Sequence, residues 1–478
     1  MNARIGRLFA VIAVGLIALI GMTTYWQVWA RGSLEARQSN VRLVYRDLEV
    51  DRGAIIAADG VVLADSVPGR LDGRDVFLRR YPEKGLAAPR GGYSALLAGR
   101  AGLERALDPE LTGATSDLAG VRNAFDRMRG DTVRGDDVVL RLVAAAQQAA
   151  IDGLRGAGGA GSVVVIDPSN GGLLVMASTP TFDPNGGLAD ALDASGSPLL
   201  NRATQGLYPP GSTFKVVTAA SALDNGVVEV STEFPAGACI ETGGQELCNF
   251  NGKDPGEHDF GYALVNSVNT TMASVGIELG EERLEQTMAG FGFFKRVPWD
   301  YPADQNLASG IYNRRGDQVR PGANVDEARL AIGQERLLAT PLQMALVAAA
   351  VANGGQVPQP QPVLEVRAPD GSVTRRPGAA FLGRAMTTET AAELRLLMQQ
   401  VVDEGTGGAA NVEGLDVAGK TGTAETGDDG LNDAWFIGFA PASAPRYAIA
   451  VLVERTAGTG GDVAAPIAAD VLRALSGS

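Results

Sequence analysis

Histidine is nearly absent from this sequence, since His258 is the only one in 478 residues. A metal site built from several histidines is therefore excluded, and a serine–histidine–aspartate triad has a single candidate base. A lone histidine is more often a loop or surface residue. Acidic residues outnumber basic ones, 55 to 41, so the formal net charge is −14. Binding of nucleic acid needs a basic surface, so no nucleic-acid partner is expected.

Lysine is much rarer than arginine. Only five of the 41 basic residues are lysines, namely Lys84, Lys215, Lys253, Lys295 and Lys420. Arginine keeps its proton in a protein, whereas lysine can lose it and act as a base. A lysine close to a plausible nucleophile is therefore informative in this chain.

One such pair lies in LYPPGSTFKVV, residues 207–217, where Lys215 follows Ser212 by three positions. On a helix these two side chains share one face. Partial burial and the positive end of the helix dipole both disfavour protonated lysine, which makes it a better base. The alternative is that Ser212 only caps a helix, since serine after proline and glycine is common at a helix start.

Long apolar runs are lacking beyond the N-terminus. Residues 8–29 are 22 residues without a formal charge, which is enough to span a bilayer. Arg4 and Arg7 precede this stretch and favour a cytoplasmic N-terminus. We expect an uncleaved single-pass anchor within residues 1–30, with the remainder outside the cytoplasm. A cleaved signal peptide is the alternative, although its apolar core is usually only about 7–15 residues long.

Cysteine occurs only at Cys239 and Cys248. Both lie in the part expected outside the cytoplasm, where disulfides form and persist. We expect a disulfide that closes a short loop between them. Two unpaired buried thiols are the alternative.

The N-terminal part is expected to form a separate, non-catalytic module over residues 31–155. Its strands are weak, as in RLVYRDLEV at 42–50, and a helical pattern at 138–154 closes it. The glycine-rich residues 155–161 contain G-x-G-x-x-G but precede a strand, so we interpret them as a flexible joint and not as a dinucleotide site.

The remaining residues, 156–478, are predicted to be one α+β domain. Two apolar runs around a turn predict a β-hairpin over 162–178, and three strand-like runs return near the C-terminus. Helical patterns cover residues 212–226, 260–280, 325–353, 388–403 and 463–476. Two early strands, three late strands and helices between them indicate one mixed sheet with a helical insertion.

Two further motifs follow the serine–lysine pair. Ser267 and Asn269 form S-x-N, 55 residues after Ser212 from serine to serine, and we expect them in a short turn within an otherwise helical stretch. K-T-G begins at Lys420, 153 residues later. A hydroxyl can relay a proton, and an amide can both donate and accept hydrogen bonds. A glycine-flanked strand edge lets a peptide lie alongside it, while the lysine supplies charge for a carboxylate.

The K-T-G segment has a second interpretation. GLDVAGKT at 414–421 matches the phosphate-binding pattern G-x-x-x-x-G-K-[ST] letter for letter. That site needs a helix directly after the motif, with its N-terminus facing the phosphate. The residues that follow, TGTAETGDDGLND, are rich in glycine and acids. They predict neither a helix nor a site for phosphate.

The three motifs in this order resemble those of the penicillin-binding proteins and serine β-lactamases. Residues 161–185, 331–355 and 433–441 are similar to recurrent segments of the transpeptidase domain. RRYPEKGL and GGYSALLAGRAGLE resemble the N-terminal module of monofunctional class B penicillin-binding proteins, especially the PbpA-like branch. The resemblance implies an antiparallel five-stranded sheet flanked by helices, with a helical subdomain. An elongated module of the pedestal or dimerisation type and one transmembrane helix would precede it.

Several positions depart from the pattern of that family. Ala57 and Ala58 stand where Asp and Arg are common, and Val143 stands where Asp is usual. These changes raise the question of how the N-terminal module is braced. Glu335 stands where Gly is frequent. None of the four belongs to the three motifs.

The resemblance also implies roles for the motif residues. Ser212 would attack the carbonyl of a D-Ala-D-Ala stem peptide and become acylated, with Lys215 as its base. Ser267 would pass the proton to the leaving amine, and Asn269 would position Lys215 and the substrate. The terminal carboxylate would be held by the K-T-G-T segment, that is by Lys420, Thr421, Gly422 and Thr423. Covalent catalysis of this kind needs no metal and no cofactor.

The implied function is peptidoglycan D,D-transpeptidation, with β-lactams as acylating inhibitors and carboxypeptidation as a side activity. The partners would be stem peptides, their lipid-linked precursor and a multi-span glycan polymerase, because no glycosyltransferase-like segment is evident. A β-lactamase would share the motifs but is normally smaller and has a single domain. A β-lactam-binding sensor and a non-catalytic scaffold of cell-wall assembly are two competing functions for the same fold.

Overall fold

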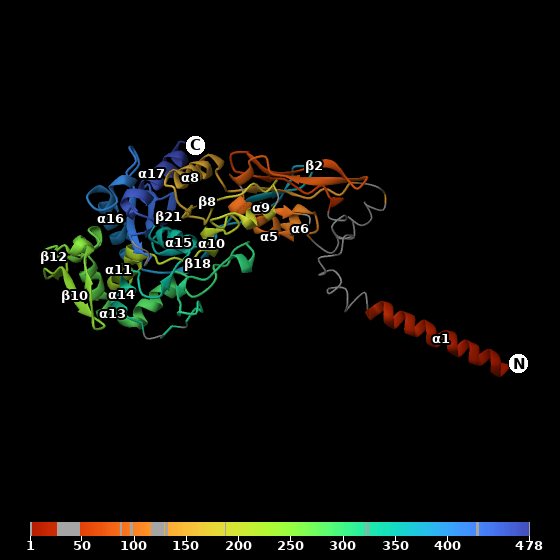
Figure 1. Cartoon of the computed structure of the whole chain (residues 1–478), viewed down its shortest axis with the longest axis horizontal. Coiled ribbons are helices and arrows are strands. Elements are labelled where there is room, and N and C mark those ends of the chain that lie inside the picture. The colour runs from red at the N-terminus through yellow and green to blue at the C-terminus, as the bar shows by residue number, and fades with distance from the viewer. Residues whose placement is uncertain are drawn as a thin grey trace.

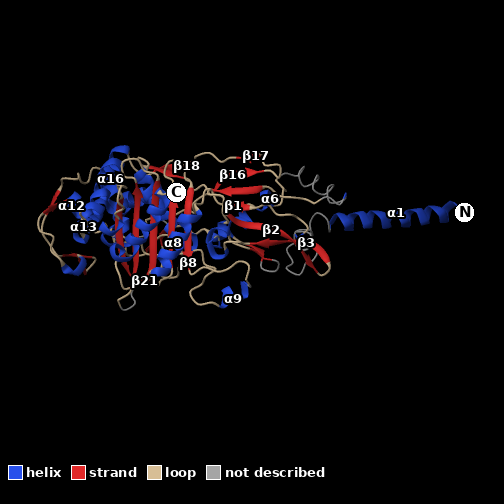
Figure 2. Cartoon of the chain, turned by 90° about the horizontal axis from the view of Figure 1, so that it is seen from above, coloured by secondary structure: helices blue, strands red, loops and turns tan. Residues whose placement is uncertain are grey.

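We describe a computed structural model of the chain. It describes residues 2–25, 48–86, 88–95, 99–115, 129, 132–186, 188–319, 321–322, 325–426 and 430–477. Figure 1 shows an N-terminal helix, an N-terminal module and a larger domain that carries the three motifs. The module and the helices around α13 lie at opposite ends of a central sheet, as Figure 2 also shows.

The N-terminal helix α1 spans Asn2–Thr24. Its segment Gly6–Thr24, 19 residues, is long and apolar enough to cross a membrane, and none of it is buried against the protein. Within the described residues no other helix meets that test. The apolar stretch predicted at 8–29 thus begins inside this helix, and residues 26–29 lie outside the described residues.

The N-terminal module is built on a six-stranded sheet with strand order β17-β16-β6-β1-β2-β3. Its strands are β1 (Ile55–Ile56), β2 (Val62–Leu71), β3 (Arg74–Arg80), β6 (Asp137–Leu140), β16 (Val363–Arg367) and β17 (Val373–Arg375). The short helices beside it are α4 (Ala88–Gly91), α5 (Gly102–Ala106) and α6 (Asp108–Leu111). Two strands of this sheet therefore come from a segment more than 200 residues later in the chain.

Two expectations for this region are wrong. The helix predicted from residue 138 begins only at Ala144, as α8 (Ala144–Gly156), because Val138–Leu140 pair with β1 and β16 as strand β6. Residues 48–50 are not a strand, and the rest of the strand predicted at 42–50 lies outside the described residues. Strand pairing with distant segments overrides a local helical pattern.

Charged side chains brace the module. The Arg52 guanidinium lies 2.8 Å from one carboxylate oxygen of fully buried Glu104, and Arg79 lies 2.7 Å from the other. Asp59 takes over a capping role at α8: its carboxylate accepts a hydrogen bond of 2.8 Å from the Ala144 N–H, whereas the N-cap residue Val143 provides no side-chain cap. The missing Asp at 143 is thus replaced by a carboxylate from another segment.

The central sheet has five strands in the order β19-β20-β21-β7-β8, and every neighbouring pair is antiparallel. The strands are β7 (Gly161–Ile166), β8 (Leu173–Thr179), β19 (Ala418–Glu425), β20 (Asn432–Ala440) and β21 (Tyr447–Thr456). The two early and three late strands predicted from the sequence thus form one sheet, which is antiparallel, as the family resemblance implies, and not mixed as the strand pattern indicated. β19, which carries K-T-G, is an edge strand.

The residues at 155–161 do not form a joint between separate bodies. Helix α8 packs against β8 and against the last helix, α17 (Ala465–Ser476), so both sides of this segment belong to the same core. Gly161 in β7 allows close packing against α8, because a Cβ there would lie 2.8 Å from Leu154 Cδ2. The domain boundary at 155 and 156 stays a prediction.

Most of the helices between the early and late strands differ from their predicted bounds. They are α9 (Leu188–Asp193), α10 (Arg202–Gln205), α11 (Lys215–Asp224), α12 (Phe260–Val265), α13 (Asn269–Gly290), α14 (Glu327–Ala331), α15 (Pro341–Ala352) and α16 (Thr388–Asp403). Only the helix at 388–403 matches its prediction residue for residue. The helical stretch at 260–280 is interrupted at Ser267, as the predicted short turn requires, whereas the interruption of the helix predicted at 325–353 by residues 332–340 was not predicted.

Short strands complete the fold. They are β4 (Ser94–Ala95), β5 (Gly99–Arg100), β9 (Glu233–Phe234), β10 (Cys239–Thr242), β11 (Gln245–Cys248), β12 (His258–Asp259), β13 (Gly310–Ile311), β14 (Leu337–Leu338), β15 (Gln356–Pro358) and β18 (Phe381–Arg384). Among them β10 and β11 form the hairpin that precedes the S-x-N turn.

Candidate active site

Ser212 lies in a short 3-10 turn, Gly211–Phe214, directly before α11. The N-cap residue of this turn is Pro210, and no side chain caps it. Within the described residues no hydrogen bond of the Ser212 hydroxyl is found, so Ser212 does not act as a helix cap. Its side chain is partly exposed, while both neighbours are buried. The structure thus leaves the Ser212 hydroxyl available for chemistry.

Lys215 is fully buried at the first residue of α11. Its Nζ donates hydrogen bonds to the Ser267 carbonyl oxygen at 2.8 Å and to Asn269 Oδ1 at 2.6 Å, and it lies 3.2 Å from Ser267 Oγ. The first two partners can only accept, so they take two N–H groups of the amine. A neutral amine has a lone pair in place of the third N–H group, and this lone pair can accept a hydrogen bond from a serine hydroxyl. The structure records no hydrogen bond between Lys215 and Ser212.

Burial and electrostatic repulsion change the acidity of this amine. Desolvation lowers the pKa of Lys215 well below its usual range, and the positive charge of Lys420 lowers it further. Removal from water disfavours the charged form of a lysine, and a like charge acts in the same direction. The lowered pKa favours the neutral amine, which is the form of Lys215 that can accept a proton.

The S-x-N segment forms a turn between α12 and α13. Ser267 has a φ of 60°, in the left-handed region that a residue with a side chain seldom adopts. This conformation directs both its carbonyl oxygen and its hydroxyl to Lys215, as the distances above record. An outlier of this kind costs about 1–3 kcal/mol and clusters at functional sites.

Residues 248 and 249 hold the start of α13 in place. Asn269 Nδ2 donates to the Cys248 carbonyl oxygen at 2.9 Å, which fixes the Asn269 amide with its oxygen facing Lys215. Asn249 Oδ1 accepts from the Thr270 N–H at 3.0 Å and so caps the helix from another segment. Neither contact was predicted from the sequence, where Asn249 carries no signal beyond its place next to Cys248.

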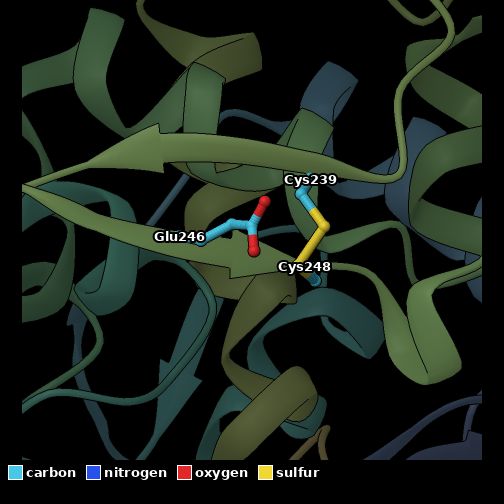
Figure 3. Close-up of side chains that lie close together, drawn as sticks. All are labelled: Cys239, Glu246 and Cys248. Carbon is cyan, nitrogen blue, oxygen red and sulfur yellow. A yellow bond between two sulfur atoms is a disulfide. The ribbon is translucent and has the colours of Figure 1, made fainter.

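Cys239 and Cys248 form a disulfide across the β10–β11 hairpin (Figure 3). Together with Glu246 they are the one group of three potential metal-ligating residues in the described part of the chain. The two sulfurs are bonded to each other, so neither is a thiolate that could hold a metal ion. The hairpin thus supports the S-x-N turn through Cys248.

Lys420 is fully buried within strand β19. Desolvation lowers its pKa to about 7, and its Nζ donates to the carbonyl oxygen of Thr421 at 3.2 Å. Residues 418–425 are extended and hydrogen-bonded to β20. The phosphate-binding interpretation of GLDVAGKT is therefore wrong, because it requires a helix directly after Lys420.

Strand β19 packs closely against the turn that carries Ser212. A Cβ at Gly422 would lie 3.0 Å from the Pro210 carbonyl oxygen and 3.1 Å from the Thr213 nitrogen. Gly211, with a φ of 51°, lies against Thr423 and Ala424 from the other side. Glycine at 211 and 422 therefore brings the nucleophile turn and the edge strand together.

The two threonine hydroxyls of β19 have partners that were not predicted. Thr423 Oγ1 accepts from the Gly460 N–H at 3.2 Å, and Thr421 Oγ1 lies 2.6 Å from Thr406 Oγ1. Thr406 stands between two glycines in the sequence, as does the K-T pair of the motif. The two flanking glycines could have marked Thr406 as part of a tight turn, but they do not indicate that Thr406 lies next to β19.

Residues 332–336 form the other wall of the nucleophile turn. Gly333 has a φ of 77° and its carbonyl oxygen accepts from the Gly211 N–H at 3.0 Å. Glu335 also has a positive φ, of 63°, which explains why glycine suits this position. Its carboxylate pairs with the adjacent Arg336 at 3.1 Å.

His258 is buried, contrary to the expectation of a surface position. Its ring nitrogens lie 2.7 Å from Gly256 O and 2.7 Å from Thr271 Oγ1. Both nitrogens are thus engaged away from Ser212, and the base next to the serine is Lys215.

Comparison with known proteins agrees with this arrangement. Residues 161–473 match the model of the penicillin binding protein transpeptidase domain, and residues 52–138 match that of the penicillin binding protein A dimerisation domain. The chain is 36% identical over 499 aligned positions to the peptidoglycan D,D-transpeptidase PbpA of Mycolicibacterium smegmatis, covering 98% of this chain and 97% of that protein.

Solved structures of penicillin-binding proteins are also similar to this chain. The ceftriaxone acyl-enzyme complex of penicillin-binding protein A from Mycobacterium tuberculosis is similar, with a TM-score of 0.79 and 34% identity, covering 89% of this chain and 98% of that one. The apo form of penicillin binding protein 3 from the same organism has a TM-score of 0.74 and 28% identity, covering 90% and 96% of the two chains.

Proposed function

This chain belongs to the penicillin-binding protein transpeptidase family, and we propose that it cross-links peptidoglycan stem peptides through an acyl-enzyme on Ser212. The observation that carries the proposal is the set of hydrogen bonds from buried Lys215 to Ser267 and Asn269. Lys215 follows Ser212, whose hydroxyl has no hydrogen-bond partner within the described residues, by three positions. β-Lactams, which imitate the D-Ala-D-Ala terminus, would acylate the same serine.

In the first half-reaction Lys215 acts as a neutral base. It takes the proton of Ser212 while Ser212 Oγ bonds to the carbonyl carbon of the penultimate D-Ala. The peptide bond to the terminal D-Ala then breaks. Lys215 returns the proton through the Ser267 hydroxyl to the leaving amine, and free D-Ala departs. The backbone N–H groups of Ser212 and Thr423 stabilise the oxyanion.

In the second half-reaction the amine of another stem peptide attacks the ester. The C–O bond to Ser212 breaks, Ser212 regains a proton, and a new peptide bond forms the cross-link. Attack by water in place of the amine gives a D,D-carboxypeptidase side activity. Asn269 keeps Lys215 oriented in both half-reactions. The Asn269 amide is itself held in place by its hydrogen bond to the Cys248 carbonyl oxygen.

The terminal carboxylate of the substrate binds at β19. Protonated Lys420 supplies the charge, and the hydroxyls of Thr421 and Thr423 supply hydrogen bonds. Gly422 is the residue that lets the strand lie against the nucleophile turn. The free edge of β19 gives an extended stem peptide a place to pair.

The rest of the chain fits a membrane-anchored enzyme. Arg4 and Arg7 lie at the N-terminal end of the apolar helix, so the N-terminus is cytoplasmic and the catalytic domain faces the cell wall. Glycan strands come from a separate multi-span polymerase, which we propose as a partner at the membrane.

The test combines covalent labelling with a cross-linking reaction. The full-length protein in detergent should form a persistent adduct with fluorescent penicillin and should cross-link lipid-linked precursor after its polymerisation. Rapid turnover of the penicillin would indicate a β-lactamase instead. A lasting adduct without cross-linking would indicate a sensor, and no adduct would indicate a scaffold.

A further inference from the structure

A threonine outside the three motifs contacts the proposed carboxylate site. Thr406 lies in the turn after α16, and its hydroxyl oxygen is 2.6 Å from that of Thr421 in β19. Thr421 is only 7% exposed, and Lys420 Nζ binds its carbonyl oxygen. Thr421 is thus held at its backbone by Lys420 and at its side chain by Thr406.

The turn that carries Thr406 is closely packed. A Cβ at Gly405 would lie 2.7 Å from the Val265 carbonyl oxygen, and one at Gly461 would lie 2.7 Å from the carbonyl oxygen of Thr406. The Gly407 N–H donates to the Val401 carbonyl oxygen at 2.8 Å. These contacts therefore hold the backbone of the turn that carries Thr406.

The direction of the hydrogen bond between the two hydroxyls decides what Thr421 can do. Each hydroxyl has one proton, and only one of the two can donate across a single contact. Within the described residues the Thr406 hydroxyl has Thr421 as its one partner. If Thr406 donates, the proton of Thr421 is left for another acceptor.

Thr423, on the same strand, also has a hydroxyl that accepts a hydrogen bond. Its Oγ1 accepts from the Gly460 N–H, which can only donate. The Thr423 proton is consequently free for a ligand. Thr421 and Thr423 are two residues apart on a strand and lie on one face, so both protons can serve the same anion.

We propose that Thr406 is a positioning residue for carboxylate recognition. Its hydroxyl donates to Thr421 Oγ1, so that the Thr421 proton points to the terminal carboxylate of a stem peptide or a β-lactam. An accepting hydroxyl is also a stronger donor, because hydrogen bonds in a chain polarise one another. The inference rests on the proposed function, since it assumes that a carboxylate binds at β19.

The test compares Thr406→Val, which removes the hydroxyl at nearly constant size, with Thr406→Ser, which keeps it. Both are made in the full-length chain, with folding checked by thermal melting. The second-order rate of acylation by fluorescent penicillin should fall about tenfold in Thr406→Val, the effect of one hydrogen bond to a charged group. Thr406→Ser should stay within about twofold of wild type. In cross-linking assays Thr406→Val should raise KM more than it lowers kcat.

Two readouts separate positioning from a structural effect. The methyl ester of the same penicillin lacks the carboxylate. Thr406→Val should therefore react with this ester at the wild-type rate, whereas a distorted site would react more slowly with both the ester and the acid. In a Thr421→Val background, removing the Thr406 hydroxyl should have no additional effect. Thr406→Ala replaces Thr406→Val in both readouts if the valine variant does not fold.

The outcomes also separate this inference from the proposed function. If wild type is acylated but Thr406→Val reacts at the wild-type rate, or loses as much with the ester as with the acid, the role of Thr406 is refuted while the transpeptidase proposal stands. If wild type forms no adduct with penicillin, both proposals are refuted.

Discussion

At the scale of single residues, the site depends on two buried lysines with different tasks. Burial lowers the pKa of each, and the charge of Lys420 lowers that of Lys215 further. The sequence led us to expect Lys420 to stay charged, but with a pKa of about 7 it titrates in the neutral range. A bound carboxylate would stabilise its protonated form, because opposite charge favours the ionised amine.

Replacement of each lysine by arginine distinguishes these tasks. Lys215→Arg should abolish acylation, because a guanidinium stays protonated and loss of a base in such sites costs about 10⁴–10⁶-fold. Lys420→Arg keeps the charge but changes its shape, so acylation should fall by roughly 10²-fold. Both are measured as second-order rates with fluorescent penicillin. Equal rates, or a faster Lys215→Arg, would show that the roles are assigned wrongly.

The two lysines also predict how acylation depends on pH. The rate should rise with pH as Lys215 loses its proton, and it should fall above about pH 7 as Lys420 loses the charge that binds the carboxylate. In Lys420→Arg the alkaline fall should disappear, since arginine remains charged. Rates measured from about pH 5 to 10 test this. An unchanged alkaline limb in Lys420→Arg would assign that limb to another group.

At the scale of elements, local patterns predicted some structures well and others poorly. The strands of the central sheet and the helix at 388–403 follow from apolar periodicity and turn residues, whereas the three motifs were recognised by their order and by the resemblance to penicillin-binding proteins. The short turn at Ser267 was predicted, but the break at 332–340 was not, because it depends on a contact with Gly211 far along the chain. The supports Thr406 and Asn249 were missed for the same reason: their partners are distant in sequence.

The β10–β11 hairpin is the element that links the disulfide to the site. Replacing both Cys239 and Cys248 by alanine should lower the free energy of unfolding by about 2–3 kcal/mol, as expected for a short closed loop. It should also slow acylation, because the Cys248 carbonyl oxygen orients Asn269. Thermal melting and penicillin labelling measure the two effects. A variant that melts and reacts like wild type would show that the hairpin needs no covalent link.

At the scale of the whole molecule, the N-terminal module and the catalytic domain share structure. Strands β16 and β17 leave the catalytic domain and complete the sheet of the module. Arg375 of β17 pairs with Glu110 of the module at 3.0 Å. The sequence could not indicate this exchange, since β16 and its partner β6 are more than 200 residues apart in the chain.

This shared sheet predicts which truncation keeps activity. Replacing residues 1–30 by a cleavable signal should release a soluble protein that is acylated at the wild-type rate, since all three motifs lie beyond the N-terminal module. A shorter form that starts at residue 156 should be unstable, because β6 would be missing beside β16. Expression yield, melting and labelling of both forms check this. A stable, active form from residue 156 would contradict it.

The most direct test of the account is to locate the acyl group. The full-length protein is incubated with benzylpenicillin, digested and mapped by mass spectrometry, beside Ser212→Ala as the control. We predict a single adduct on Ser212 in the wild type and none in Ser212→Ala, with both proteins folded. An adduct on any other residue, or an equal adduct in Ser212→Ala, would contradict the central claim that Ser212 is the nucleophile.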